Sequence, residues 1–394
     1  MFKPLHVLQA TFLLVLTSGC ATTTPLDMPQ PETTPIQNTV TREHNVQIDM
    51  NMVHHPAPIR SGTSIAQPGP LLNADGSLPA SIQAYAADVA HTRQIPLAHV
   101  EKLLGTVSFS EQAYRLMSPG KTRVKRSWVT YRNRFVEPIR IDAGVRFWRD
   151  NKRAIEQAAE RYGVPASILV AIIGVETIYG RYTGNFRVID ALATLGFRYP
   201  DANRPERSQL FRDQLADLIQ LDYQGKLDAN EATGSFAGAM GLPQFMPGSL
   251  LRYAADGNQD GQIDLLDNTE DAVNSVARFL RLHGWIPGLP VFAPVSLSST
   301  AAEELVTAGL EPNLTWAQMQ AKGATTTASN AQALWTRHPL GVVNLVDEPR
   351  NLNEYRVATP NFFAITQYNR SYFYAASVAD LAKELAQRMG QTLP

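Results

Sequence analysis

One carboxylate stands inside an apolar run of the chain, and it is the residue best suited to proton-transfer chemistry. Glu176 follows Ile168-Leu-Val-Ala-Ile-Ile-Gly-Val and precedes Thr-Ile-Tyr-Gly180. Apolar surroundings remove the hydration that favours a charged carboxylate, so we expect the pKa of Glu176 to be raised. A carboxylic acid that stays protonated near neutral pH can donate a proton to a leaving group. Because a lone Glu at a helix end more often faces water, other motifs must decide between these interpretations.

A second segment of interest, Gly234-Ser-Phe-Ala-Gly-Ala-Met-Gly-Leu-Pro-Gln-Phe-Met-Pro247, combines small residues with aromatic and Met side chains. Its glycines allow the backbone to approach a ligand closely. Ser235 supplies a hydroxyl and Gln244 an amide, and both groups suit sugar hydroxyls or N-acetyl groups. By itself, such a run is more typical of tight helix packing.

The segment from Asp256 to Asp267 follows the pattern of an EF-hand loop, with oxygen-bearing side chains at alternating positions and Gly261 at the sharp turn. Position twelve is Asp267, where the pattern has the longer Glu. A flexible loop of carboxylates suits Ca²⁺ better than Mg²⁺, so we expect a structural calcium ion; an unoccupied acidic turn is the alternative. The predicted ligands are Asp256, Asn258, Asp260 and Gln262, with the last place open among Asp267, Glu270 and Asp271.

The first twenty residues have the composition of an export signal. Lys3 precedes a short apolar stretch at 8–16, which is too short to span a hydrocarbon core of about 30 Å. The ending Thr17-Ser-Gly-Cys20 resembles a bacterial lipobox, in which Cys20 would be lipidated and become the new N-terminus. Cys20 is also the only cysteine, so no intramolecular disulfide can form. We therefore expect a lipid anchor in the outer membrane of a Gram-negative bacterium, facing the periplasm; a plain secreted protein is the alternative.

The elements that must position these residues are predicted to be mostly helical. Lys and Arg (35) nearly balance Asp and Glu (36), so bulk charge does not indicate nucleic acid as a partner. Residues 21–77 are rich in Thr, Pro and Gln and are predicted to be a disordered tether. Short runs at 290–297, 341–346 and 354–357 predict strands. Apolar spacing predicts helices at 81–91, 96–104, 110–117, 145–162, 190–195, 208–220, 272–283 and 374–389, and one from about 165 that carries Glu176.

Four segments together resemble the membrane-bound lytic murein transglycosylase B family: the Glu176 run, the 234–247 run, Arg187-Val-Ile-Asp-Ala-Leu-Ala-Thr-Leu195 and Tyr368-Asn-Arg-Ser371. The resemblance covers about residue 127 to the C-terminus. It implies an α+β, predominantly helical fold with a lysozyme-like catalytic core. The expected parts are a helical domain at 78–150 with the C-terminal helix 370–390, the core at 151–289 with its loop 256–271, a small β-rich domain at 290–357, and a segment 358–394 that completes the groove.

The resemblance implies a lytic transglycosylase that acts on peptidoglycan. Such an enzyme cleaves the β-1,4 bond between N-acetylmuramic acid and N-acetylglucosamine and leaves 1,6-anhydromuramic ends. Glu176 would protonate the glycosidic oxygen and then act as base toward the muramic C6 hydroxyl. Intramolecular attack by that hydroxyl makes a second carboxylate unnecessary, and no cofactor is implied for catalysis. Asp190 does not compete, because its position predicts a helix N-cap.

The resemblance also implies which residues hold the substrate. Aromatic faces with a polar tip suit sugar rings. Phe279 stands where the family has Tyr, which keeps the ring and loses the hydroxyl. In the family an acid beyond the acidic loop completes the calcium site, and Asp271 is its match. The implied saccharide contacts are Tyr131, Ser235, Gln244, Phe279, Tyr368, Asn369 and Tyr374.

Two other functions are compatible with parts of the sequence. A catalytically silent peptidoglycan-binding lipoprotein would be expected to lack the acid, and Glu176 is present. A lysozyme-like hydrolase would use a second carboxylate in the cleft, for which the sequence offers no compelling candidate. The expected partners are glycan strands, the outer membrane through Cys20, and complexes of cell-wall synthesis or hydrolysis; a monomer is the default. Exo and endo cleavage both stay open.

Overall fold

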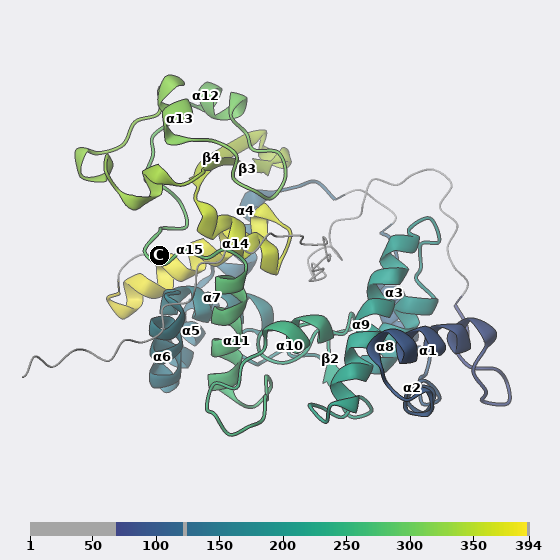
Figure 1. Ribbon diagram of the computed structural model, residues 1–394. Coiled ribbons are helices and arrows are strands. Elements are labelled where there is room, and N and C mark those ends of the chain that lie inside the picture. Colours follow the sequence, from purple (N-terminus) through teal and green to yellow (C-terminus); the bar gives the residue numbers. More distant parts are fainter. Residues whose placement is uncertain (1–67, 121–123, 392–394) are drawn as a thin grey trace, which may run out of the picture. The chain divides into compact units, whose positions relative to one another are not determined.

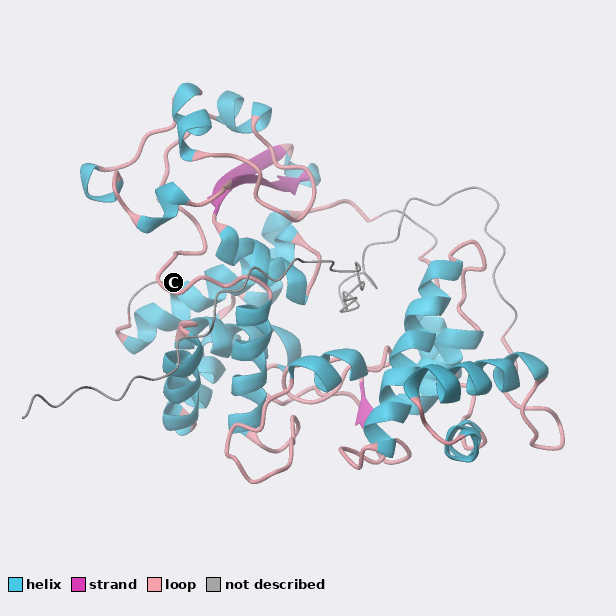
Figure 2. Ribbon diagram, in the orientation of Figure 1, coloured by secondary structure: helices cyan, strands magenta, loops and turns pink. Residues whose placement is uncertain are grey.

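The computed structural model describes residues 68–120 and 124–391. The predicted signal segment, Cys20 and most of the predicted tether lie outside these residues. Helices make up most of the described chain, and strands are few (Figure 2). In chain order the elements are α1 (Ala80–Arg93), α2 (Leu97–Leu104), α3 (Glu111–Met117), α4 (Trp128–Phe135), α5 (Pro138–Asp150), α6 (Lys152–Tyr162), α7 (Ala166–Thr177), β1 (Phe186–Arg187), α8 (Val188–Phe197), α9 (Pro205–Tyr223), β2 (Thr233–Gly234), α10 (Pro247–Tyr253), α11 (Thr269–Leu282), α12 (Ser299–Glu304), α13 (Trp316–Ala321), η2 (Ala328–Asn330), η3 (Leu334–Arg337), β3 (Gly341–Asp347), η4 (Glu348–Arg350), β4 (Leu352–Ala358), α14 (Pro360–Tyr368) and α15 (Tyr372–Met389).

Helix α7 carries Glu176 and is the central helix of the core. Its residues from Ser167 to Val175 are all buried, and Thr177 at its end is buried too. A helix that is apolar on every side is stable only inside a core, and α7 packs against α5, α6, α11 and α15 (Figure 1). Pro165 directly precedes its first turn, where the missing amide hydrogen removes no helical hydrogen bond.

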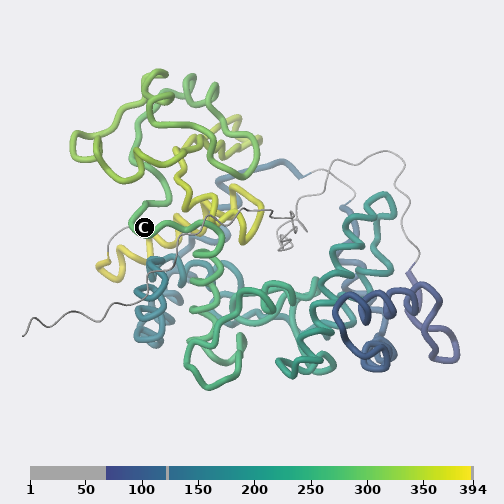
Figure 3. The backbone as a smooth tube through the Cα atoms, viewed as in Figure 1, coloured from purple at the N-terminus to yellow at the C-terminus, as the bar shows by residue number. Residues whose placement is uncertain are grey.

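The C-terminal helix α15 packs beside the segment that precedes α7 in the chain. Figure 3 shows this yellow segment beside the blue one, and α15 contacts α4, α5 and α7. Within the described residues no single helix is long and apolar enough to cross a membrane. Only α6 and α7 together, bent by 116°, would meet that test by length and composition.

Two local predictions are wrong, each because a polar side chain bonds the backbone in a different way. The predicted helix 145–162 is broken at Asn151, whose side chain donates to the Phe147 carbonyl (3.0 Å) and closes α5. Asp190 is not an N-cap, because α8 already begins at Val188. Its carboxylate instead accepts from the Ser108 amide (2.8 Å) and pairs with Arg187 (3.0 Å).

The first three helices pack mainly on α8 and α9. The main contacts are of α1 and α2 with α9 and of α3 with α8. The Tyr85 hydroxyl donates to the Arg212 carbonyl (2.8 Å), and buried Asp217 pairs with Arg93 (2.7 Å) and Arg252 (3.2 Å). The segment 78–150 therefore has two sets of contacts: α1 to α3 pack on α8 and α9, whereas α4 packs on α15 and α5 packs on α7 and α15.

The segment after α11 contains less strand than the sequence predicts. One antiparallel hairpin pairs β3 with β4, from Gly341 opposite Ala358 to Asp347 opposite Leu352. The predicted strand at 290–297 forms only isolated bridges, and short helices occupy much of the remainder. A separate small core that includes Met319 and Trp335 supports this region.

Ion pairs join the hairpin to the helices beside it. Asp380 on α15 pairs with Arg132 on α4 (2.6 Å) and with Arg356 on β4 (2.6 Å). The Trp128 indole donates to Glu354 on β4 (2.9 Å). The hairpin is thereby tied to the two helices, α4 and α15, that also contribute predicted site residues.

Candidate active site

Glu176 lies in the last turn of α7, and its side chain is half-buried. The hydroxyl of Tyr374, from the first turn of α15, donates to Glu176 Oε1 at 2.6 Å. Tyr374 is only 1% exposed, so this bond is shielded from bulk water. A hydrogen bond to a carboxylate oxygen that is protected from water is stronger than a neutral one at the surface. The fold thus fixes the orientation of the carboxylate that the sequence singles out.

Tyr374 is stacked on a second buried tyrosine. The rings of Tyr368 and Tyr374 are nearly parallel (9°), with centroids 6.3 Å apart, and the Tyr368 hydroxyl donates to the Pro243 carbonyl. Burial raises the pKa of both tyrosines well above 10, and the nearby charge of Glu176 raises it further. Both hydroxyls therefore remain protonated donors at physiological pH. They connect Glu176 to the 234–247 segment.

The 234–247 segment is anchored to α7 and to the loop that follows it. Thr177 Oγ1 donates to the Leu242 carbonyl (3.1 Å), and Gly234 pairs with Phe186 in the β1–β2 ladder. Gln244 Nε2 donates to the carbonyls of Gly241 (3.0 Å) and Thr183 (3.1 Å). These bonds hold the small-residue segment against the end of α7, so part of it serves packing.

Ser235 and Gln244 are both buried and have structural roles in this arrangement. Ser235 Oγ accepts from the Ala239 amide at 3.0 Å, which closes a tight turn. Gln244 has a left-handed backbone (φ 50°) and spans the turn with its amide. Their contact with a saccharide stays a prediction.

The other predicted binding residues lie on α4, on α11 and at the end of α14. Tyr131 on α4 is buried against Phe135 and Phe373. It lies close enough to Tyr374 to contribute to the raised pKa of that residue. Asn369 is buried at the end of α14. Phe279 and Tyr368 are fully buried and touch each other (4.9 Å between centroids). These two rings form the layer behind the site, so a direct contact with sugar would require them to be uncovered.

Behind Phe279 lies a half-buried histidine, His283, whose titration should affect stability. The rings of Phe279 and His283 stack at 3.9 Å, and Nδ1 of His283 bonds the Phe279 carbonyl (2.7 Å). Burial lowers the pKa of His283 below its usual 6.5, although the bond to the carbonyl opposes this. The unfolded chain therefore takes up the proton first as the pH falls below about 6.5.

We expect the unfolding free energy to decrease as the pH falls from 6.5 toward the lower pKa of folded His283. Above pH 6.5 the contribution of neutral His283 to stability should be fully present. One such group changes the stability by at most about 1.4 kcal/mol per pH unit. His283→Gln should flatten the slope of Tm between pH 5 and 7, whereas replacement of the exposed His91 by Gln should not. An unchanged slope in His283→Gln would show that His283 does not contribute this dependence.

The acidic loop is held together by backbone hydrogen bonds to its carboxylates. Asp256 accepts from the amides of Gln259 (2.6 Å) and Gly261 (2.8 Å). Asp271, 1% exposed, accepts from Gly257 and Asp264, both at 2.7 Å, and so closes the two ends of the loop. No group of three acidic, His or Cys side chains converges on a common point in the described part of the chain.

An open cavity of about 640 Å³ beside this loop collects several further oxygen atoms. The donor types suit calcium, but Asp271 is committed to the backbone and the remaining side chains are spread around the cavity. A calcium ion would thus require the loop to tighten around it. The acidic and amide side chains of the loop at this cavity are Asn258, Asp260, Gln262, Asp264, Asp267, Asn268 and Glu270.

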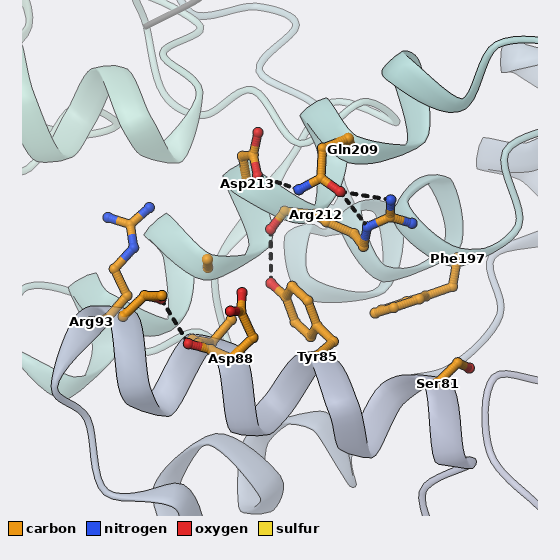
Figure 4. Close-up of a pocket in the computed structure, with 11 residues that line it drawn as sticks. Ser81, Tyr85, Asp88, Arg93, Phe197, Gln209, Arg212 and Asp213 are labelled. Atoms are coloured by element: carbon orange, nitrogen blue, oxygen red, sulfur yellow. Dashed lines mark hydrogen bonds between the residues drawn. The ribbon is translucent and has the colours of Figure 1, made fainter. Parts of the chain in front are cut away.

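Another cavity, of about 320 Å³, lies between α1 and α9 (Figure 4). Gln209 bonds both Asp213 and Arg212 in its wall, and Tyr85 donates to the Arg212 carbonyl. Its polar side chains thus largely satisfy one another. None of the residues predicted from the sequence for catalysis or binding lines it.

Sequence reasoning missed two residues that support the end of α7. Thr177 follows Glu176 directly, and its hydroxyl donates to the Leu242 carbonyl. Its position next to the acid was the feature of the sequence that could have indicated this role. The guanidinium of Arg140 on α5 donates one hydrogen bond to the Gly174 carbonyl and another to the Arg134 carbonyl (3.2 Å). No local pattern around Arg140 indicates this contact, which depends on the packing of α5 on α7.

Comparison with known proteins gives consistent matches. The transglycosylase SLT domain family matches residues 78–383. The membrane-bound lytic murein transglycosylase B of Escherichia coli (strain K12) is 36% identical over 260 residues, which cover 66% of this chain and 68% of that protein.

Solved structures match over most of the chain. The soluble lytic transglycosylase SltB1 from Pseudomonas aeruginosa is 36% identical, with a TM-score of 0.69 over 79% of this chain and 99% of that one. The Escherichia coli lytic transglycosylase Slt35 in complex with calcium is 31% identical, with a TM-score of 0.67 over 82% and 97%. SltB3 from Pseudomonas aeruginosa in complex with NAG-anhNAM-pentapeptide is 25% identical, with a TM-score of 0.62 over 77% and 78%.

Proposed function

The chain belongs to the transglycosylase SLT domain family and is a lytic murein transglycosylase with a lysozyme-like fold, and from this premise we propose that Glu176 is its single catalytic acid and base. The observation that carries the proposal is the 2.6 Å bond from Tyr374 to Glu176 Oε1 at the half-buried end of α7. Glu176 is also the carboxylate whose charge acts on both Tyr368 and Tyr374. These contacts support a site built around one acid.

The proposed reaction uses the two protonation states of Glu176 in turn. Protonated Glu176 donates its proton to the glycosidic oxygen between N-acetylmuramic acid and N-acetylglucosamine, and the bond from C1 to that oxygen breaks. The resulting carboxylate then accepts the proton of the muramic C6 hydroxyl while O6 bonds to C1. The product is a 1,6-anhydromuramic end, Glu176 is protonated again, and no water is consumed. The high effective molarity of the C6 hydroxyl replaces a second enzymic carboxylate.

The fold contributes orientation to this reaction. Tyr374 holds Oε1, so the carboxyl group keeps one direction while it gives and takes a proton. Thr177 ties the same turn to the Leu242 carbonyl (3.1 Å), which keeps the 234–247 segment at a fixed place beside the acid. On this segment the proposed saccharide contacts are Ser235 and Gln244; Tyr131, Asn369 and Tyr374 are proposed from α4, the end of α14 and α15. All five side chains are buried, so a contact with sugar would require them to be uncovered as well.

The reaction is tested by digesting purified murein in ¹⁸O-labelled water and identifying the muropeptides by mass spectrometry. Anhydromuramic ends without ¹⁸O are expected. Reducing ends that carry ¹⁸O, as a lysozyme would give in a parallel digestion, would contradict transglycosylation. Absence of any soluble product would instead favour a silent peptidoglycan-binding protein.

We also propose that the acidic loop binds calcium, with ligands drawn from Asp256, Asn258, Asp260 and Gln262 and an acid that follows. The support is the oxygen donor set and the calcium complex of the related Slt35. The role would be structural, because the loop leads directly into α11, whose Phe279 lies behind Tyr368.

Calcium at about a hundredfold excess over its Kd is expected to stabilise the fold by about 2.7 kcal/mol, and a chelator should lower Tm accordingly. Asp260→Ala should abolish the calcium-dependent rise in Tm, and the exposed Asp228→Ala should preserve it. Mg²⁺ is the ionic control. The same Tm with calcium and with chelator would refute the site.

The place of action is proposed from the N-terminal sequence. Lipid on Cys20 would anchor the enzyme to the outer membrane, facing the periplasm, where its substrate lies. The related Escherichia coli enzyme is membrane-bound. Mass spectrometry of the mature N-terminus decides, since an unmodified Cys20 would refute the anchor.

A further inference from the structure

The two residues that follow the α7 helix have a backbone conformation that side chains rarely adopt. Ile178 has φ 51° and Tyr179 has φ 59°, and both lie in the left-handed region. For a β-branched residue such as Ile178 this region is a clear outlier. Strain of this kind persists only where the surroundings impose it, and it gathers at functional sites. Here it begins two residues after Glu176.

The side chain of Tyr179 explains what imposes the turn. Its ring is folded back into the contact between α5 and α7, at Gly144 and Gly174. A Cβ atom at Gly174 would lie 2.5 Å from Tyr179 Cζ, and one at Gly144 would lie 2.8 Å from the same atom. Both positions must therefore lack a side chain while the ring is in place. Phe147 packs on the ring as well (5.4 Å between centroids).

The polar groups around the ring fix the same turn of α7. Buried Arg140 donates to the Gly174 carbonyl, which also accepts from the Ile178 amide (3.2 Å). Burial raises the pKa of Tyr179, so its hydroxyl is neutral. Among the described residues this buried hydroxyl has no hydrogen-bond partner. Packing of the ring, rather than a bond of its hydroxyl, is what Tyr179 contributes.

The turn is also bonded to the residues that follow it and to the 234–247 segment. Thr177 Oγ1 accepts from the Gly180 amide (3.0 Å), and the Tyr182 amide donates to the Thr177 carbonyl (2.9 Å). Thr177 in turn holds the Leu242 carbonyl. A change in the turn would therefore move the residue next to Glu176 and the segment beside it.

We propose that Tyr179 is a positioning residue for the reaction: its ring, held between Gly144 and Gly174, fixes the left-handed turn and thereby the direction in which Glu176 points toward Tyr374. The inference rests on the proposed catalytic role of Glu176. Displacement of a reacting group by about 1 Å can cost about a hundredfold in rate. A loosened turn should therefore slow the chemical step more than it weakens substrate binding.

The test compares Tyr179→Ala with Tyr179→Phe on soluble, uncrosslinked glycan strands. Tyr179→Ala is expected to lower kcat about tenfold or more with KM within about twofold, and Tyr179→Phe, which keeps the ring, should retain kcat within about twofold. Tyr199→Ala is the control, because Tyr199 is a buried ring stacked on Phe211 between α8 and α9. It should lower Tm without lowering kcat of the folded enzyme.

Several results would overturn the inference. One is a kcat for Tyr179→Ala within about twofold of the parent enzyme; another is a loss in Tyr179→Phe as large as in Tyr179→Ala. A double-mutant cycle with Gly174→Ala gives a second readout. Gly174→Ala should lower kcat in the presence of the Tyr179 ring and have little further effect in Tyr179→Ala; additive effects would contradict the packing argument.

Failure of this inference is distinguishable from failure of the proposed function. If Glu176→Gln forms anhydromuropeptides at more than about a tenth of the parent rate, the catalytic assignment itself is wrong. If Glu176→Gln is inactive while Tyr179→Ala keeps full kcat, only the positioning role is refuted.

Discussion

Replacement of Glu176 by Gln is expected to lower kcat for anhydromuropeptide formation by about three orders of magnitude. General acid–base catalysis contributes about 10²- to 10⁴-fold, and in the proposed reaction this one residue performs both proton transfers. Gln has the same shape and retains an oxygen that can accept from Tyr374, so the fold should persist. The rate is measured by quantifying anhydromuropeptides over time, and the fold by circular dichroism and Tm.

Asp190→Asn is the matched control for this variant. Asp190 is also a carboxylate in a helical turn, but it is bonded to Ser108 and Arg187 rather than to Tyr374. Its replacement should change kcat by only a few-fold. A Glu176→Gln enzyme with more than about a tenth of the parent activity would exclude Glu176 as the sole acid and base.

Tyr374→Phe is expected to lower kcat by about 10- to 100-fold with a much smaller change in KM. A hydrogen bond to a charged group contributes about 1.5–3 kcal/mol, and each 1.36 kcal/mol in the barrier is tenfold in rate. The variant keeps the ring that stacks on Tyr368 and removes only the donor to Glu176 Oε1. Initial rates over a range of glycan-strand concentrations separate the two kinetic constants.

Tyr368→Phe provides the comparison, because it removes an equally buried hydroxyl that bonds the Pro243 carbonyl and not the acid. Tyr368→Phe should lose about 0.5–1.5 kcal/mol of unfolding free energy and Tyr374→Phe about 1.5–3 kcal/mol, but Tyr368→Phe should lose much less of its kcat. Equal losses of kcat would mean that the stacked pair acts only through packing.

Much of the helical content could be predicted, because apolar spacing is a local property of the chain. The predicted helices at 96–104 and 110–117 correspond closely to α2 and α3, and the last predicted helix corresponds to α15. The errors arose where one side chain changed a local outcome. Asn151 closed α5 with its own amide, and Asp190 bonded a distant amide rather than capping α8.

The acidic loop shows a different limit of sequence reasoning. The spacing of oxygen-bearing residues indicates a cation loop, but spacing does not tell which carboxylates remain available. Asp271, the match expected to complete the calcium shell, accepts two backbone amides instead. Because a carboxylate can satisfy either a cation or the loop's own backbone, only the folded arrangement distinguishes these uses.

The sequence by itself determined the family and the helix that carries Glu176, and it singled out Glu176 as the candidate acid, since these follow from residue types over short spans. The tertiary structure decided what orients the acid. Tyr374 lies 198 positions after Glu176, and Arg140, Gly144 and Gly174 meet around Tyr179 only because α5 packs on α7. Contacts between distant segments depend on how several helices fill one core, and no local periodicity encodes that arrangement.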